Sequence, residues 1–317
     1  MRILVADSMS KDAIKKLSID HEVIEDEMTP ERLLKEISNY EALVVRSRSK
    51  VTEKIISASK LRVIGRAGIG VDNIDVRAAT MKKIPVVYAP HGSTISVAEL
   101  TVGQIISLSR SLPQADRSMK AGNWDKKSFE GIEIFGKTLG LLGCGRIGTE
   151  VAKRCQAFGM RTIAYDPYLS KEIAEKNSIL LLSSFDELLR ESDFLSIHSV
   201  LTNETRNMLR APQFKTMKPS AYVVNIARGG IIDEDDLSEA IRSKIIAGAA
   251  IDTFDSEPLP TKSQLRDPNL NILLTPHIGA STHEAQKRAG TMVAEEVLKV
   301  LAGKRPDFCV NPEVLGK

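Results

Sequence analysis

The stretch Thr138-Leu-Gly-Leu-Leu-Gly-Cys-Gly-Arg-Ile-Gly148 decides the fold of this 317-residue chain. Its short apolar run is typical of a buried strand, and a helical pattern over residues 146–158 follows its glycines. Gly143 permits a tight turn, Gly145 lets the backbone approach a pyrophosphate, and Gly148 lets the helix pack against the strand. Free N–H groups at the helix start would bind the phosphates. An ordinary strand-to-helix turn is the alternative, because glycine-rich turns are common.

The segment after this helix favours a dinucleotide site. Residues 161–165 form another short apolar run that ends at Asp166, where an acid can accept hydrogen bonds from the adenosine ribose. A carboxylate repels a 2′-phosphate, and Pro167-Tyr168 supply no arginine to bind one. The pattern therefore predicts NAD rather than NADP as the cofactor, although Asp166 taken alone would also suit a cap.

Six short apolar runs in the second part of the chain predict strands. They lie at residues 138–142, 161–165, 194–197, 222–226, 247–251 and 272–274. Six strands with crossovers between them are typical of a doubly wound, parallel-sheet α/β domain of the Rossmann type, and we place this NAD-binding domain at residues 93–282.

A smaller α/β pattern occupies the N-terminal part of the chain. Strands are expected at residues 3–6, 22–24, 42–45, 62–64 and 85–88, with helical patterns such as 30–38 and 52–58 between them. This alternation predicts a second doubly wound parallel sheet, of the flavodoxin-like type.

Two long helical segments connect the predicted domains. Residues 93–121 form one segment that is too long for an ordinary crossover, and residues 281–302 follow the last strand of the Rossmann sheet. We expect the first segment to be a connector helix and the second to return to the first domain. The substrate-binding domain would then comprise residues 1–92 and 283–317, with a cleft between the two domains.

The composition excludes several classes of protein. A net charge of +3 and an aromatic content of 4% argue against a nucleic-acid partner, and the apolar runs are too short for a membrane span. Cys144, Cys155 and Cys309 have no spacing typical of a disulfide framework or of metal ligands, which fits a reducing compartment. We expect a cytoplasmic protein without a metal site.

Three charged residues, Arg228, Glu257 and His277, each follow one of the last predicted strands. Ligands of open α/β sheets bind outside the carboxyl ends of the strands, so we expect these side chains to meet at one crevice. Singly, such an arginine is typically a surface ion pair and such a histidine a satisfied polar residue. Together they could bind an acid and move a proton.

Ordered motifs along nearly the whole chain extend these observations. They are Val45-Arg-Ser-Arg-Ser-Lys-Val-Thr52, Gly65-Arg-Ala-Gly-Ile-Gly-Val-Asp-Asn73, Ala98-Glu-Leu-Thr101, Gly136-Lys-Thr-Leu-Gly140, the glycine loop, Asn225-Ile-Ala-Arg-Gly-Gly230, Asp255-Ser-Glu-Pro258 and Pro276-His-Ile-Gly-Ala280. In these motifs the chain resembles the D-isomer-specific 2-hydroxyacid dehydrogenases.

The resemblance implies roles for individual residues. Arg228 would bind the substrate carboxylate, His277 would carry the proton, and Glu257 would pair with His277. The implied cofactor contacts are Gly143, Gly145, Arg146, Ile147, Gly148, Asp166, Ser199, Ile226, Ala227, Asp252, Gly279 and Ala280, with Asp252 beside the nicotinamide carboxamide. The implied substrate contacts are Arg46, Ser47, Arg66, Gly68, Ile69, Gly70 and Lys126, the last reaching a neighbouring subunit.

The surplus of basic residues near the expected cleft suits a phosphorylated substrate. We therefore expect NAD-dependent oxidation of D-3-phosphoglycerate to 3-phosphohydroxypyruvate, the entry to serine synthesis, by a homodimer or a dimer of dimers. Glyoxylate or hydroxypyruvate reduction is the alternative, and a dinucleotide-regulated binding protein is an alternative of another class. Pro90-His-Gly-Ser93 and Val200 depart from the usual motifs near the substrate and nicotinamide sites. The chain ends soon after Leu315, so we expect no regulation through an additional C-terminal domain.

Overall fold

The computed structural model describes residues 1–316. The chain divides into two compact units, Met1–Thr94 with the segment from Ala280 onward, and Ile95–Gly279. The divisions lie close to the expected boundaries at residues 92 and 283. Within the described residues no helix is long and apolar enough to cross a membrane.

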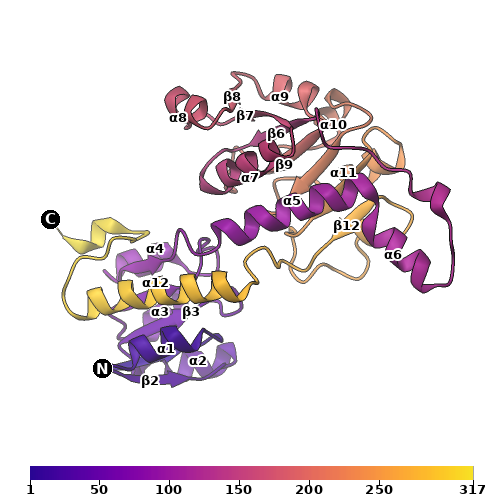
Figure 1. The fold of residues 1–317 in the computed structure, drawn as a ribbon. Helices are drawn as coiled ribbons and strands as arrows, with labels where there is room; N and C mark the ends of the chain where they lie inside the picture. The colour runs from indigo at the N-terminus through magenta and orange to yellow at the C-terminus, as the bar shows by residue number, and fades with distance from the viewer. Residues whose placement is uncertain (317) are drawn as a thin grey trace. The chain divides into compact units, whose positions relative to one another are not determined.

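A five-stranded parallel sheet forms the first unit (Figure 1). Its strands, in spatial order, are β2 (Glu22–Glu25), β1 (Arg2–Val5), β3 (Ala42–Val45), β4 (Val63–Arg66) and β5 (Val86–Tyr88). This order reverses direction between β1 and β3, and such a switch point is where doubly wound sheets bind ligands.

Helices cover both faces of this sheet. They are α1 (Lys11–Leu17), α2 (Pro30–Glu36), α3 (Glu53–Ala58), α4 (Val76–Met81) and α12 (His283–Leu301), with the 3₁₀ turns η1 (Ile37–Asn39) and η4 (Pro312–Leu315). One core holds α1 and α12 against the sheet, and the other holds α2, α3 and α4. In Figure 1 the yellow α12 lies along the indigo N-terminal elements, although it comes last in the chain.

The second unit contains a seven-stranded parallel sheet. Its spatial order is β12 (Ile272–Leu274), β11 (Gly248–Ile251), β10 (Tyr222–Asn225), β9 (Phe194–Ile197), β6 (Thr138–Leu142), β7 (Arg161–Tyr165) and β8 (Leu180–Leu181). The order is that of a Rossmann sheet with one added edge strand, and its switch point lies between β6 and β9.

Two apolar cores also flank the second sheet. The other elements between Thr94 and Gly279 are α5 (Thr94–Arg110), α6 (Leu112–Lys120), η2 (Lys126–Phe129), α7 (Arg146–Ala157), α8 (Lys171–Lys176), α9 (Phe185–Glu191), α10 (Ala211–Thr216), α11 (Glu234–Arg242) and η3 (Gln264–Arg266), of which α6 and η2 bury no residue. The predicted fold class of two doubly wound parallel α/β sheets is confirmed.

Two details of the prediction were wrong. The segment 93–121 is two helices rather than one, because Ser111 adopts a left-handed conformation with φ of 49°. Pro113, which follows two residues later, cannot donate the hydrogen bond that would continue α5, and this signal was available in the sequence. The sheet also has a seventh strand, β8, whose two residues are too few to show a pattern.

Candidate active site

The glycine loop lies at the switch point of the second sheet, after β6. Gly143 has φ of 81°, a conformation that favours glycine. A Cβ atom at Gly143 would lie 2.8 Å from the backbone nitrogen of Ser199, the second residue after β9. The loops that follow the two central strands are therefore in close contact, which a side chain at residue 143 would prevent.

The loop fits a dinucleotide by its shape and by its hydrogen-bonding groups. A Cβ atom at Gly145, the residue before α7, would meet no atom within 4 Å, so space is open where a pyrophosphate would bind. The Ser199 hydroxyl is buried and has no hydrogen-bond partner within residues 1–316, which suits a polar contact with a cofactor. The contacts of Arg146, Ile147 and the other expected cofactor residues stay predictions.

Asp166 shapes the loop as well as following β7. One carboxylate oxygen accepts a hydrogen bond of 2.8 Å from the Cys144 N–H, and the other accepts one of 2.9 Å from the Tyr168 N–H. The carboxylate thus ties the glycine loop to the end of β7. The structure thus shows the capping role that the sequence left as an alternative, and the contact of Asp166 with the ribose stays a prediction.

Arg228 is presented by a turn that Asn225 closes. Asn225, only 2% exposed at the end of β10, donates from Nδ2 to the Arg228 carbonyl at 2.9 Å and accepts from the Ala227 N–H at 3.1 Å. The next residue, Gly229, packs against the loop that follows β11, where a Cβ atom would lie 1.9 Å from the Phe254 oxygen. Only a residue without a side chain allows these two loops to meet.

His277 and Glu257 form a direct pair, 2.8 Å and 3.0 Å between Nδ1 and the two carboxylate oxygens. The pairing leaves Nε2 of the ring for a substrate. Burial acts to raise the pKa of Glu257, but hydrogen bonds with His277 and the Phe254 N–H, with the charges of His277 and Arg228, lower it overall. The carboxyl group is therefore ionised at neutral pH and able to orient the imidazole.

The backbone around His277 is held by Asp252, which is fully buried. Its carboxylate accepts hydrogen bonds from the Ile278 and Gly279 N–H groups at 2.9 and 2.8 Å, and from the Thr275 hydroxyl at 2.6 Å. These bonds fix the turn in which His277 has φ of 53°. The sequence did not indicate this support, and the expected contact of Asp252 with the nicotinamide stays a prediction.

In the first unit, Asp7 organises the basic loop at the switch point of the sheet. Asp7 is 4% exposed and accepts hydrogen bonds from the Arg46 N–H, from Ser49 and from the Arg48 guanidinium. Arg48 also pairs with Glu27, so its charge is compensated within the unit. Arg46 and the exposed Ser47 remain candidate substrate groups, whereas Asp7 was missed because a single acid after a strand carries no distinctive pattern.

The N–H groups of the loop after β4 were expected to hold a carboxylate, but one of them is not available. The Gly68 N–H donates to the Arg66 carbonyl at 2.8 Å and is therefore occupied. The Ile69 and Gly70 N–H groups form no hydrogen bond with any of residues 1–316, so they are the groups that remain for a ligand.

The other reactive side chains of the second unit do not suit catalysis. Burial lowers the pKa of His198 to about 4, and its Nε2 lies 2.9 Å from the Ser196 hydroxyl. Burial likewise raises the pKa of the Cys144 thiol to about 11 and that of Cys155 to about 12. Lys126 is exposed in η2, and its expected contact with a neighbouring subunit stays a prediction.

The second unit contains an imidazole that can transfer a proton and a glycine loop that can bind a dinucleotide. These are the groups that an NAD-dependent oxidoreductase requires. Residues 102–279 match the family described as D-isomer specific 2-hydroxyacid dehydrogenase, NAD binding domain. The chain belongs to this family, which confirms the resemblance and NAD as the cofactor.

The similarity to individual relatives covers nearly the whole chain. D-3-phosphoglycerate dehydrogenase of Methanocaldococcus jannaschii is 50% identical over 324 residues, which cover 100% of this chain and 62% of that protein. The crystal structure of the TT0316 protein from Thermus thermophilus has a TM-score of 0.90 and 32% identity, covering 98% of this chain and 100% of that one. A glyoxylate reductase from Paecilomyes thermophila has a TM-score of 0.89 and 28% identity, covering 99% of each chain.

Proposed function

We propose that this chain oxidises D-3-phosphoglycerate to 3-phosphohydroxypyruvate with NAD⁺, the step that leads into serine synthesis. The observation that carries the proposal is the His277–Glu257 pair beside Arg228, in a chain 50% identical to a D-3-phosphoglycerate dehydrogenase. The chain spans about three-fifths of the length of that relative, so the activity is inferred for the part that it covers.

The residues of the second unit would act on the reacting end of the substrate. Arg228 binds the carboxylate through its planar guanidinium and polarises the C2 oxygen. His277 takes the hydroxyl proton at Nε2, because Nδ1 is held by Glu257. NAD⁺, when bound, supplies the acceptor for the hydride that leaves C2. In the reverse direction His277 returns the proton to the carbonyl oxygen.

The far end of the substrate would be bound by basic and backbone groups. Arg46, Ser47 and Arg66, with the Ile69 and Gly70 N–H groups, are the proposed contacts in the first unit, and Lys126 is the proposed contact from a partner subunit. A homodimer or a dimer of dimers and a cytoplasmic location, both expected from the sequence, stay predictions.

The main alternative is a reductase of glyoxylate or hydroxypyruvate, which the likeness to the glyoxylate reductase favours. Turnover under saturating NAD⁺ should be compared for D-3-phosphoglycerate, D-glycerate and D-lactate, and under NADH for glyoxylate and hydroxypyruvate. We expect the highest kcat/KM with D-3-phosphoglycerate. Equal or faster turnover of an unphosphorylated acid would exclude this assignment, and absence of all turnover would favour a dinucleotide-regulated binding protein.

A further inference from the structure

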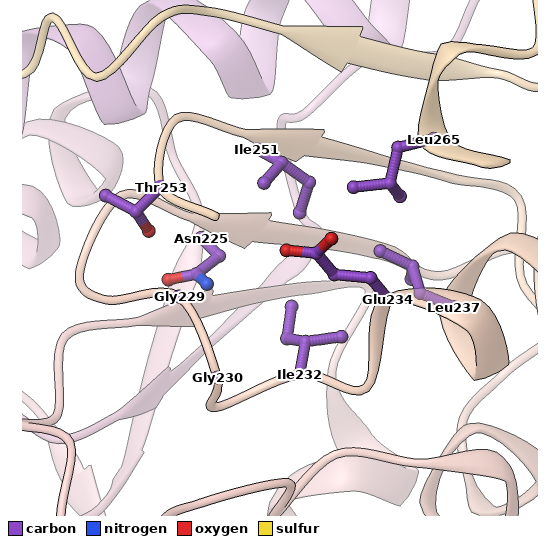
Figure 2. Close-up of a pocket in the computed structure, with 9 residues that line it drawn as sticks. All are labelled: Asn225, Gly229, Gly230, Ile232, Glu234, Leu237, Ile251, Thr253 and Leu265. Atoms are coloured by element: carbon purple, nitrogen blue, oxygen red, sulfur yellow. The ribbon is translucent and has the colours of Figure 1, made fainter. Parts of the chain in front are cut away.

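A small cavity of about 10 Å³ lies beneath the loops that carry Arg228 and Glu257. Figure 2 shows the residues that line it, which come from the end of β10 and the loop after it, from the start of α11, from the end of β11 and the loop after it, and from η3. They are Asn225, Gly229, Gly230, Ile232, Glu234, Leu237, Ile251, Thr253 and Leu265. Most of this lining is apolar or glycine, so the three polar side chains Asn225, Glu234 and Thr253 are conspicuous in it.

Glu234 connects α11 to the segment that presents Glu257. One of its carboxylate oxygens accepts a hydrogen bond of 2.8 Å from the Asp255 N–H, two residues before Glu257. The neighbouring Phe254 N–H donates directly to Glu257 at 3.1 Å. Two successive N–H groups of this segment therefore bind two carboxylates, one from α11 and one that orients His277.

The cavity offers a second connection between the same elements. The Thr253 hydroxyl, in a residue 2% exposed, has no hydrogen-bond partner within residues 1–316. In Figure 2 the Glu234 carboxylate points into the space between Ile232 and Ile251. Asn225 and Thr253 lie beyond the carboxylate, on the side away from the Glu234 backbone. A space of this volume holds one water molecule when it has two to four polar partners, and these side chains supply them.

The electrostatic surroundings of Glu234 fit a constrained carboxyl group. Burial raises its pKa, the Asp255 N–H opposes that rise, and the charges of Asp255, Asp235 and Asp233 add to it. Glu234 is partly buried, and a carboxyl group removed from water to this extent needs hydrogen-bond donors for its oxygens. The Asp255 N–H is one such donor, and a water in the cavity would be another.

We propose that Glu234 is a positioning residue that holds Glu257 in place through the Asp255 N–H, and that it shares one buried water with Thr253. The predicted effect of Glu234 on turnover rests on the proposed dehydrogenase function, whereas its hydrogen bonding does not. The support acts on the orientation of Glu257, and through it on His277, rather than on the substrate.

The kinetic test is a double-mutant cycle with Glu234→Ala and Glu257→Gln. Because Glu234 acts through Glu257, we expect E234A to lower kcat roughly 5- to 20-fold with little change in the KM for NAD⁺. In the E257Q background, E234A should change kcat less than about two-fold. An equal loss in both backgrounds, or no loss in either, would overturn the proposal.

Two further variants control this experiment. Asp235→Ala removes a neighbouring, exposed charge from the same turn of α11 and should leave kcat within about two-fold of the wild type. Glu234→Gln keeps an oxygen that can accept the Asp255 N–H and should restore most of the activity. A loss with D235A as large as with E234A would show a general charge effect and overturn the positioning role.

A second measurement needs no substrate and separates this proposal from the proposed function. Hydrogen–deuterium exchange of the backbone N–H groups of residues 253–257 should be faster in E234A and in Thr253→Val than in the wild type and D235A. If E234A does not fold, T253V alone tests the shared water, and unchanged exchange in T253V would overturn it. Turnover of a different hydroxy acid would contradict the assigned substrate, but it would leave the exchange result and the mutant cycle valid with that acid.

Discussion

His277 combines a left-handed backbone with a side chain that is held at one nitrogen only. Asp252 binds the two N–H groups after it, and Glu257 binds its Nδ1, so the ring is fixed while Nε2 stays available. A non-glycine residue in this conformation costs about 1–2 kcal/mol, which the surrounding hydrogen bonds must offset. The backbone is thus constrained at the residue that we propose carries the proton.

We expect His277→Gln to lower turnover roughly 10²- to 10⁴-fold, because glutamine cannot accept and return a proton. NADH affinity, measured by fluorescence titration, should be nearly unchanged, since the glycine loop is not altered. His283→Gln, at the exposed start of α12, is the matched control and should keep wild-type turnover. A variant H277Q with an unaltered rate would exclude His277 as the acid and base.

The single residue Asp7 should make the free energy of unfolding depend on pH. Burial raises its pKa, but hydrogen bonds from Ser49, Arg46 and Arg48 bring it below the ordinary value of 3.8. The ionised group therefore stabilises the first unit above pH 3.8, and this stabilisation is lost as the pH falls through the lower pKa of the folded state. Asp7→Asn should reduce the free energy of unfolding at pH 7 by about 1–3 kcal/mol.

The test is urea unfolding of wild type and D7N over a range of pH. The difference between the two proteins should shrink as the pH falls below 3.8. Asp20→Asn, an exposed position on the same unit, should stay within about 0.5 kcal/mol of the wild type. A constant difference between D7N and wild type at all pH values would show that the lost stability does not come from the ionised carboxylate.

At the scale of elements, the chain is redirected where α5 ends and α6 begins. Ser111 has φ of 49° and ψ of 40° at this break, with no side-chain cap. Ser111→Gly should stabilise the protein by roughly 0.5 kcal/mol, because glycine adopts this conformation without the steric cost. Thermal unfolding checks the prediction by an increase in Tm.

Ser118→Gly places the same substitution inside α6. It should have the opposite effect, a loss of about 0.5–1 kcal/mol, because glycine is unfavourable in a helix interior. If both variants lowered Tm equally, the break at Ser111 would not be a strained position.

At the scale of the whole molecule, we expect kcat/KM for the proposed substrate to depend on ionic strength. A phosphorylated acid carries more negative charge than D-glycerate, and the chain has a net charge of +3 with basic candidate contacts. The kcat/KM for D-3-phosphoglycerate should fall roughly 3- to 10-fold between low and high ionic strength, because salt screens attraction beyond about 10 Å. D-glycerate should show a smaller change, and an equal change for both acids would contradict binding of the phosphate by basic residues.

The local patterns of the sequence were sufficient for the class of fold and for a set of candidate reactive residues. Apolar runs of strand length, the glycine loop and the charges after β10, β11 and β12 depend on residues close together in the chain. For this reason the two parallel sheets and the cofactor could be anticipated, whereas the pairing of Glu257 with His277 was expected from the family resemblance. The break at Ser111 could have been anticipated too, from Pro113.

The supports of the site were decided only by the tertiary structure. Asn225, Asp252 and Glu234 each look like an ordinary polar residue near a strand or helix end, and Asp7 looks like a loop acid. The Asn225 side chain bonds within its own turn, to residues two and three positions later. Asp7, Asp252 and Glu234 instead accept hydrogen bonds from residues 21 to 42 positions away, which lie near them only because parallel strands bring their carboxyl ends to one edge. The sequence alone therefore determined the class of fold and the candidate reactive groups. The packing of distant loops decided which buried polar groups hold them in place, because a buried carboxylate or amide must find its partners wherever the fold puts them.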